Sequence, residues 1–189
     1  MRRRQLLGTL GTAVAGGVAG CGESAQSTPG AFRVSSPALE SGGKLPARFT
    51  CDGAGRSPPF VLDRVPEPTA GLAVIAEYDR GIINEPVFWT LWNVPPETER
   101  IPAGLPRTGT VESLGGARQG RPEGGEVGYE PPCPPTGQPY EHRFQVYALG
   151  ETVDVAGGTD HDTAGEAIGD AVLASARFTV DYERTPAPA

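Results

Sequence analysis

Apolar residues along the chain come in short blocks, and glycine or proline stands between most of them. Several blocks are apolar at both alternating positions, which is typical of strands buried between two layers. Because proline and glycine interrupt a strand ladder, the blocks predict strands and the segments between them predict loops. An all-β sandwich is therefore expected. The predicted strand blocks are residues 31–34, 47–50, 60–62, 71–78, 87–94, 142–149 and 177–182.

One late segment has helical periodicity instead. Within residues 160–176, six small or apolar positions fall on one helical face, behind Asp160 or Asp162 as the N-cap. We expect one late helix that packs on the sandwich. Residues 103–128 are rich in glycine and predict a long loop, and no internal repeat is visible. The residues on the predicted helical face are Ala164, Ala167, Ile168, Ala171, Val172 and Ser175.

The first 20 residues have the features of an export signal: an arginine cluster, a mild apolar run and the sequence Val-Ala-Gly before Cys21. Arg3 and Arg4 suggest a twin-arginine signal, and Cys21 suggests cleavage and lipidation. A plain cleaved signal is the alternative. We expect residues 21–30 to form a flexible tether, 31–184 the folded domain and 185–189 a tail. The protein would then be anchored to the outer face of the cytoplasmic membrane through lipid on Cys21.

Three cysteines are an odd number for an exported protein, so one of them is expected to have a role outside a disulfide. Lipidation of Cys21 leaves Cys51 and Cys133, an even pair in an oxidising compartment, and we expect them to form a disulfide. Closing so long a loop would stabilise the fold by roughly 4 kcal/mol. Two buried free thiols are the alternative.

The formal net charge of −7 argues against nucleic acid as a partner, and the charge becomes more negative once the leader arginines are removed. Lys44 is the single lysine, whereas aspartate and glutamate are abundant. Such a surface suits a protein that stays soluble where salt screens charge, so a salt-adapted source is a hypothesis.

Residues that could bind a ligand lie on three of the predicted strands. Glu77 and Asp79 are two residues apart, so both carboxylates project from one face of a strand. On the next strand Phe88 and Trp92 are expected on one face and Trp89 on the other, with Phe88 our choice for a pocket. His142 and Arg143 begin a later strand. These groups are candidates for one pocket, although their spacing does not show that they meet.

Enzyme and metal sites are less favoured by the residues. We find no Gly-x-Ser-x-Gly elbow and no phosphate-binding glycine loop ahead of a helix. A triad of Ser57, His142 and an acid remains an alternative hydrolase hypothesis, but a serine in Ser-Pro-Pro is typical of turns. Glu77, Asp79 and His142 lack the local spacing of metal ligands. We therefore expect no metal, no cofactor and no catalysis.

Three ordered motifs resemble the phosphatidylethanolamine-binding protein family, also called the Raf kinase inhibitor-like family, in its microbial YbhB/YbcL branch. They are "FTCDGAGRSPPF", "FWTLWNVP" and "GYEPPCPPTGQPYEHRFQVYAL", and the resemblance runs from about residue 33 to residue 184. It implies a two-sheet antiparallel Greek-key β-sandwich with a small surface pocket for anions such as phosphate or lipid headgroups. It also implies a binding or inhibitory module without an accepted catalytic reaction.

By position, the resemblance implies a ligand site at matching residues, and two of them depart from the family pattern. Phe88 replaces the histidine before the tryptophan, and Phe144 replaces the tyrosine after His-Arg. Fewer hydrogen-bonding groups disfavour an anion, since each such bond to a charge contributes about 1.5–3 kcal/mol. A more apolar ligand, a protein partner, or a structural or protease-inhibitory role with a vestigial pocket are the alternatives. The implied site residues are Glu77, Asp79, Phe88, Pro134, Pro135, His142, Arg143 and Phe144.

Overall fold

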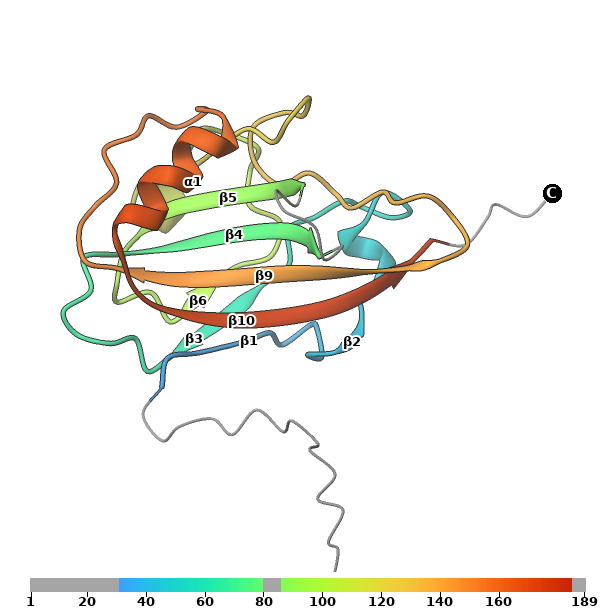
Figure 1. The fold of residues 1–189 in the computed structure, drawn as a ribbon, viewed down its shortest axis with the longest axis horizontal. Helices are drawn as coiled ribbons and strands as arrows, with labels where there is room; N and C mark the ends of the chain where they lie inside the picture. The colour runs from blue at the N-terminus through green and yellow to red at the C-terminus, as the bar shows by residue number, and fades with distance from the viewer. Residues whose placement is uncertain (1–30, 80–85, 185–189) are drawn as a thin grey trace, which may run out of the picture.

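The computed structural model describes residues 31–79 and 86–184 (Figure 1). Within these ranges the chain forms two β-sheets and one α-helix, as the sequence predicted. The elements are β1 (Arg33–Ser35), β2 (Gly43–Lys44), the 3₁₀ helix η1 (Ala47–Phe49), β3 (Phe60–Asp63), β4 (Gly71–Asp79), β5 (Val87–Val94), β6 (Arg100–Ile101), β7 (Thr110–Val111), the 3₁₀ helix η2 (Glu112–Leu114), β8 (Ala117–Gln119), β9 (Pro139–Leu149), α1 (His161–Asp170) and β10 (Val172–Glu183).

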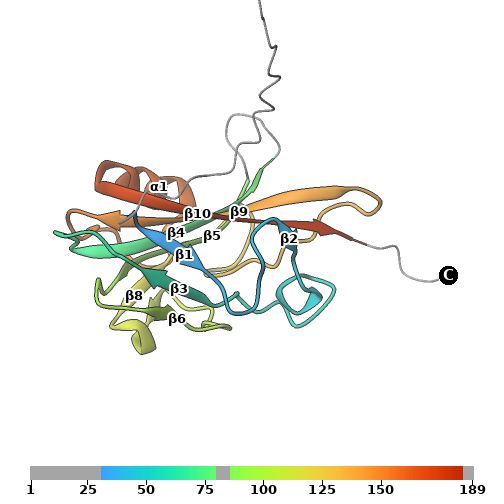
Figure 2. The ribbon, with the colours of Figure 1, turned by 90° about the horizontal axis from the view of Figure 1, so that it is seen from below.

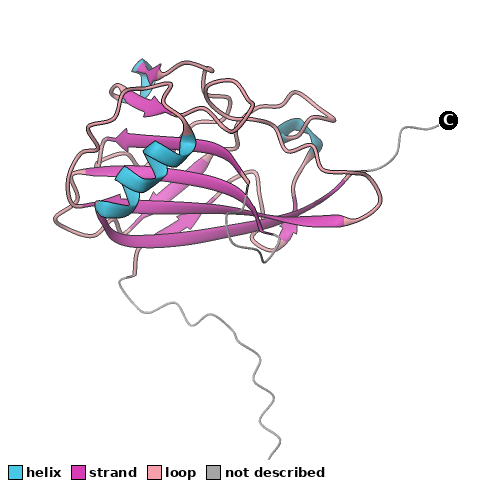
Figure 3. Ribbon diagram, turned by 45° about the horizontal axis from the view of Figure 1, so that its top comes forward, coloured by secondary structure: helices cyan, strands magenta, loops and turns pink. Residues whose placement is uncertain are grey.

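The larger sheet has seven strands in the order β2-β10-β9-β4-β5-β8-β7, and the smaller has three in the order β1-β3-β6. All neighbouring strands are antiparallel except β2, which pairs parallel to β10 at two residues. Seen from below, β1 and β3 lie on one side of the large sheet and α1 lies on the other (Figure 2). Figure 3 shows α1 lying across the strands of that sheet. The large sheet is thus covered on both faces, which explains why β4 and β5 are apolar at both alternating positions.

Two hydrophobic clusters fill the spaces on either side of the large sheet. The main cluster lies between the two sheets and includes Phe60, Leu72, Val74 and Phe144. The second lies between the large sheet and α1 and includes Trp92 and Ile168 among other buried residues. β4, β5 and β9 therefore each contribute side chains to both clusters.

The predicted helix begins where expected but ends early. Asp160 is the N-cap, since its carboxylate accepts a hydrogen bond from the Thr163 N–H at 2.9 Å. Val172 and Ser175 were placed on the helix by sequence, and that placement is wrong: both belong to β10. There Ser175 pairs with Tyr147 of β9. Pairing with β9 satisfies the backbone of this segment, although Val172 and Ser175 themselves stay exposed, and this pairing overrides local helical periodicity.

Two further local predictions are wrong. Residues 47–50 do not form a strand, because Pro46 leads into η1 and its carbonyl accepts the Phe49 N–H. Residues 103–128 are not one continuous loop, since they contain β7, η2 and β8. β8 pairs with β5 through Leu91 and Trp92 and so extends the edge of the large sheet. Tertiary pairing, rather than local composition, determines the conformation of that segment.

The predicted signal (residues 1–20), Cys21 with its tether (21–30) and the tail (185–189) lie outside the described residues. Within the part of the chain that the structure describes, no helix is long and apolar enough to span a bilayer.

Candidate functional site

The predicted site residues divide between the two faces of the large sheet. β4 and β9 pair in register, with Glu77 opposite Arg143 and Tyr78 opposite His142. Because side chains alternate along a strand, these neighbouring pairs project from opposite faces. The acidic pair and His142, which were candidates for one pocket, therefore do not meet. Glu77, Asp79 and Arg143 lie on the α1 side, whereas His142 lies on the side of the smaller sheet.

On the α1 side, Arg143 is held by two carboxylates. Its guanidinium lies 2.7 Å from Glu77 Oε1 and 2.9 Å from Asp79 Oδ2, and its Nε–H also donates to Glu77. All three side chains are largely buried, with exposed fractions of 21–25%. Charge-assisted pairs of this kind are strong when partly shielded from water. These three residues therefore form an ion-pair cluster that ties β4 to β9.

A cleft of about 630 Å³ lies beside this ion-pair cluster, between the sheet and the first turns of α1. Ile75 and Tyr147 line it from the sheet, and His161 and Glu166 line it from the helix. His161 Nδ1 lies 3.3 Å from Asp162 Oδ1. Among the residues the structure describes, no group of three or more His, Cys, Asp or Glu side chains is arranged to hold a metal ion.

On the opposite face, His142 is completely buried among aromatic rings. Its ring centroid lies 4.8 Å from that of Tyr78, 5.8 Å from that of Phe88 and 6.2 Å from that of Tyr182. We call these four residues the His142 cluster. Neither imidazole nitrogen makes a hydrogen bond of normal length and angle within the described residues. Burial lowers the pKa of His142 to about 4, and a weaker hydrogen-bonding interaction with the Tyr140 backbone opposes this effect. The ring is therefore neutral at pH 7.

Phe88, which we chose to line a pocket, and Phe144, which the resemblance placed in the ligand site, both pack into the main cluster. Their ring centroids are 5.7 Å apart and perpendicular. Phe88 is 2% exposed and also contacts the ring of Tyr129. The prediction that Phe88 and Trp92 share one face is wrong, because bulges interrupt the pairing of β4 with β5. Phe88 and Trp89 both enter the main cluster, and Trp92 enters the second.

Sequence reasoning missed Tyr78 and Tyr182. The inward set of β4 runs through Leu72, Val74 and Ala76, and strict alternation would have placed Tyr78 next on that face. Tyr182 likewise follows Val180, the cross-strand partner of His142 in β10. The motif match drew attention to the acids on either side of Tyr78, although the side chain between them is the one that contacts His142.

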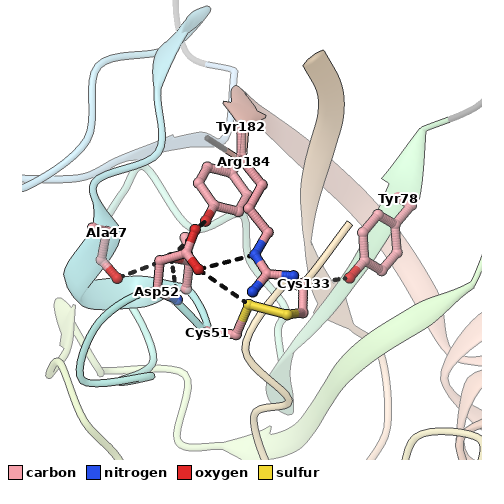
Figure 4. Close-up of polar contacts among 8 residues, drawn as sticks. Ala47, Cys51, Asp52, Tyr78, Cys133, Tyr182 and Arg184 are labelled. Atoms are coloured by element: carbon pink, nitrogen blue, oxygen red, sulfur yellow. Dashed lines mark hydrogen bonds and ion pairs between the residues drawn. A yellow bond between two sulfur atoms is a disulfide. The ribbon is translucent and has the colours of Figure 1, made fainter. Parts of the chain in front are cut away.

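The proline-rich loop of residues 131–138 lies beside the His142 cluster. The predicted disulfide between Cys51 and Cys133 is present and holds this loop in place. The Cys133 N–H donates to Tyr78 Oη at 3.2 Å. Of the two prolines expected to form a wall, Pro134 is buried and Pro135 is exposed. Figure 4 shows the disulfide lying between Tyr78 on one side and Tyr182 on the other.

Asp52, which follows Cys51, contacts Tyr182 on the other side of the disulfide. Its carboxylate accepts hydrogen bonds from the Tyr182 hydroxyl and from the Arg184 Nε–H, the latter at 2.9 Å (Figure 4). These two hydrogen bonds lower the pKa of Asp52, and the bond from Tyr182 has the larger effect. The Thr50 hydroxyl also donates to Tyr182. Tyr182 is therefore fixed between His142 and the residue that follows Cys51.

Ser57 forms no hydrogen bond with His142. Its hydroxyl oxygen accepts the Leu105 N–H at 2.9 Å, and its side chain is buried. The Ser57 carbonyl also accepts the Gly104 N–H, so Ser57 joins two segments that are distant in sequence and does not form the local turn that its Ser-Pro-Pro context indicated.

Comparisons with known proteins agree with this two-sheet architecture. The sequence profile described as phosphatidylethanolamine-binding protein matches residues 35–183. A UPF0098 protein of Pyrococcus horikoshii is 33% identical over 141 residues, which cover 74% of this chain and 71% of the relative. The UPF0098 protein YbcL of Escherichia coli is 30% identical over 161 residues, covering 81% of this chain and 88% of YbcL.

Solved structures give the same result. The crystal structure of Escherichia coli YbcL matches with a TM-score of 0.74 and 28% identity, covering 82% of this chain and 99% of that one. A phosphatidylethanolamine-binding protein homolog from Chlamydia trachomatis matches with a TM-score of 0.70 and 27% identity over the same shares. The chain belongs to the phosphatidylethanolamine-binding protein family. Within that family it falls in the UPF0098/YbcL branch of bacteria and archaea.

Proposed function

We propose that this protein is a non-catalytic binding module that holds a small, uncharged ligand against His142. The observation that carries the proposal is that the imidazole is fully buried while neither nitrogen makes a hydrogen bond of normal length and angle within the described residues. An unpaired buried polar group costs about 1–3 kcal/mol, and most such groups in native proteins have a partner. A ligand with one acceptor and one donor would satisfy both nitrogens of the neutral ring.

The charge of the cluster favours an uncharged ligand over an anion. With a pKa of about 4, His142 carries no positive charge at pH 7. The rings that contact it belong to Tyr78, Phe88 and Tyr182, which are aromatic and neutral. Arg143, the adjacent cation in sequence, is bound by carboxylates on the opposite face. A phosphate or lipid headgroup, which the family's name suggests, would lose its water here and gain no opposite charge from these groups.

Native mass spectrometry of protein purified from its own host tests the proposal. We expect the wild type and the control variant His161→Leu to retain a small molecule, and His142→Leu to lose it. His161 is a matched control because it lies on α1, away from the His142 cluster. If none of the three proteins retains a molecule, and inorganic phosphate and glycerophosphoethanolamine leave the melting temperature unchanged, the proposed function is wrong. Stabilisation by phosphate alone would favour the anionic alternative.

We also propose that the protein is exported and anchored by lipid on Cys21. The support is the arginine pair and the Val-Ala-Gly-Cys run in the sequence. Intact-mass measurement should show a mature chain that begins at Cys21 with attached lipid, and a Cys21→Ser variant should lack it. A mature chain that begins elsewhere, or one without lipid, would contradict the anchor.

A further inference from the structure

His142 is sealed in the structure, so a ligand that contacts it must displace part of the surrounding wall. Two tyrosines of that wall, Tyr78 from β4 and Tyr182 from β10, come from different edges of the His142 cluster. Both are connected by hydrogen bonds to residues at the Cys51–Cys133 disulfide. Whether the Cys51–Cys133 disulfide is oxidised or reduced therefore affects how firmly the two tyrosines are held over His142.

The Cys133 side of the disulfide holds Tyr78. The backbone N–H of Cys133 donates to Tyr78 Oη at 3.2 Å. Cys133 lies in a proline-rich loop that precedes β9 and forms no strand of its own. Without a link to the rest of the fold, such a loop has few backbone bonds to keep it in place. The covalent bond to Cys51 supplies that link, together with the hydrogen bond from the Cys51 N–H to the Pro132 carbonyl at 3.2 Å.

The Cys51 side holds Tyr182. Asp52 follows Cys51 directly and accepts the Tyr182 hydroxyl proton in a hydrogen bond. The same carboxylate binds Arg184, the residue just after β10. Displacement of the 51–52 segment would therefore remove the carboxylate that accepts the hydrogen bond of the Tyr182 hydroxyl. Figure 4 shows these contacts converging around the disulfide from both sides.

Both half-cystines are exposed, so a thiol from solution can reach the bond. In exchange with a dithiol reductant, one thiolate attacks either sulfur and the Cys51–Cys133 bond breaks, giving a mixed disulfide and one protein thiolate. The second thiolate of the reductant then attacks the reductant's own sulfur in the mixed disulfide, and the protein cysteine leaves as a thiolate. Two electrons pass to the protein, Cys51 and Cys133 end as thiols, and the reductant ends as a disulfide. A dithiol protein outside the cytoplasmic membrane is the class of reductant that this chemistry requires.

We propose that the Cys51–Cys133 disulfide is a redox-controlled gate for the His142 cluster: the oxidised form holds Tyr78 and Tyr182 closed over the imidazole, and reduction releases them. This inference rests on the proposed function, since a gate is useful only if His142 meets a ligand. It goes further by assigning the regulation of ligand access to two residues that do not themselves contact the imidazole.

Carbethoxylation of histidine, read residue by residue by mass spectrometry, tests the gate. The full chain would carry Cys21→Ser, so that Cys51 and Cys133 are its only thiols. With dithiothreitol, we expect labelling of His142 to accelerate at least about tenfold, while labelling of His161 stays constant. The Cys51→Ser/Cys133→Ser variant should show the fast rate with and without reductant. Tyr78→Phe keeps the disulfide but loses the bond from Cys133, and should accelerate labelling roughly fivefold in the oxidised state.

Equal labelling rates of His142 in the oxidised and reduced proteins would overturn the gate. Loss of the strand signal in circular dichroism on reduction would overturn it too, because the bond would then be needed for folding as a whole. The native mass measurement described above is independent of both results. A ligand retained equally by oxidised and reduced protein would refute the gate and leave the proposed function intact, whereas absence of a ligand from both states would refute the function itself.

Discussion

Acid titration of His142 gives a prediction with a defined sign and size. Burial lowers its pKa from 6.5 to about 4 in the folded protein. Between these values the unfolded chain binds a proton that the folded chain does not, so acid favours unfolding in that window. The free energy of unfolding should therefore fall as the pH falls from 6.5 to 4. One pKa unit corresponds to 1.36 kcal/mol, so the loss attributable to His142 is about 3 kcal/mol.

Urea unfolding at a series of pH values measures this loss, and His142→Leu isolates it. The variant has no imidazole to protonate, so its stability should depend less on pH between 6.5 and 4. The comparison is needed because other groups also titrate. Burial raises the pKa of Glu141, which adds stability as the pH falls, and the lowered pKa of Asp52 removes stability only at more acidic pH. Parallel curves for the two proteins would refute the claim that His142 is buried and neutral.

The remaining predictions concern stability away from the imidazole. Arg143→Ala should lower the free energy of unfolding by about 1–3 kcal/mol in urea, because two carboxylates lose a shared partner, yet leave ligand retention unchanged; loss of the ligand would contradict the separation of the two faces. Cys51→Ser/Cys133→Ser opens a loop of 82 positions and should cost roughly 4 kcal/mol, and an unchanged midpoint would count against it. Asp160→Ala should cost about 1 kcal/mol through loss of the N-cap, while Asp162→Ala should cost less; equal losses would reject Asp160 as the cap.

The fold was largely predictable because its strong signals are local. β4, β5 and β9 are long apolar runs bounded by glycine or proline, and each forms a strand close to its expected position. The disulfide followed from the cysteine count. The end of α1 was not predictable from periodicity, because residues after Asp170 gain more from pairing with β9 than from another helical turn.

The site was less predictable, because it depends on which way each side chain faces. A motif match assigns residues to positions, but one step along a strand moves a side chain to the other layer. That step separates Glu77 and Asp79 from His142 and brings Tyr78 to it instead. The bulge at Phe88 likewise changes which face of the sheet the β5 side chains occupy. Nothing in the local sequence of β5 indicates where its pairing with β4 is interrupted.

A high-resolution crystal structure of the protein purified from its own host would show whether His142 holds a ligand. We expect density for a small molecule within hydrogen-bond distance of at least one imidazole nitrogen of His142, with Tyr78 or Tyr182 displaced to admit it. An imidazole whose nitrogens are both satisfied by the protein's own groups, with no bound molecule among the rings of the His142 cluster, would contradict this expectation.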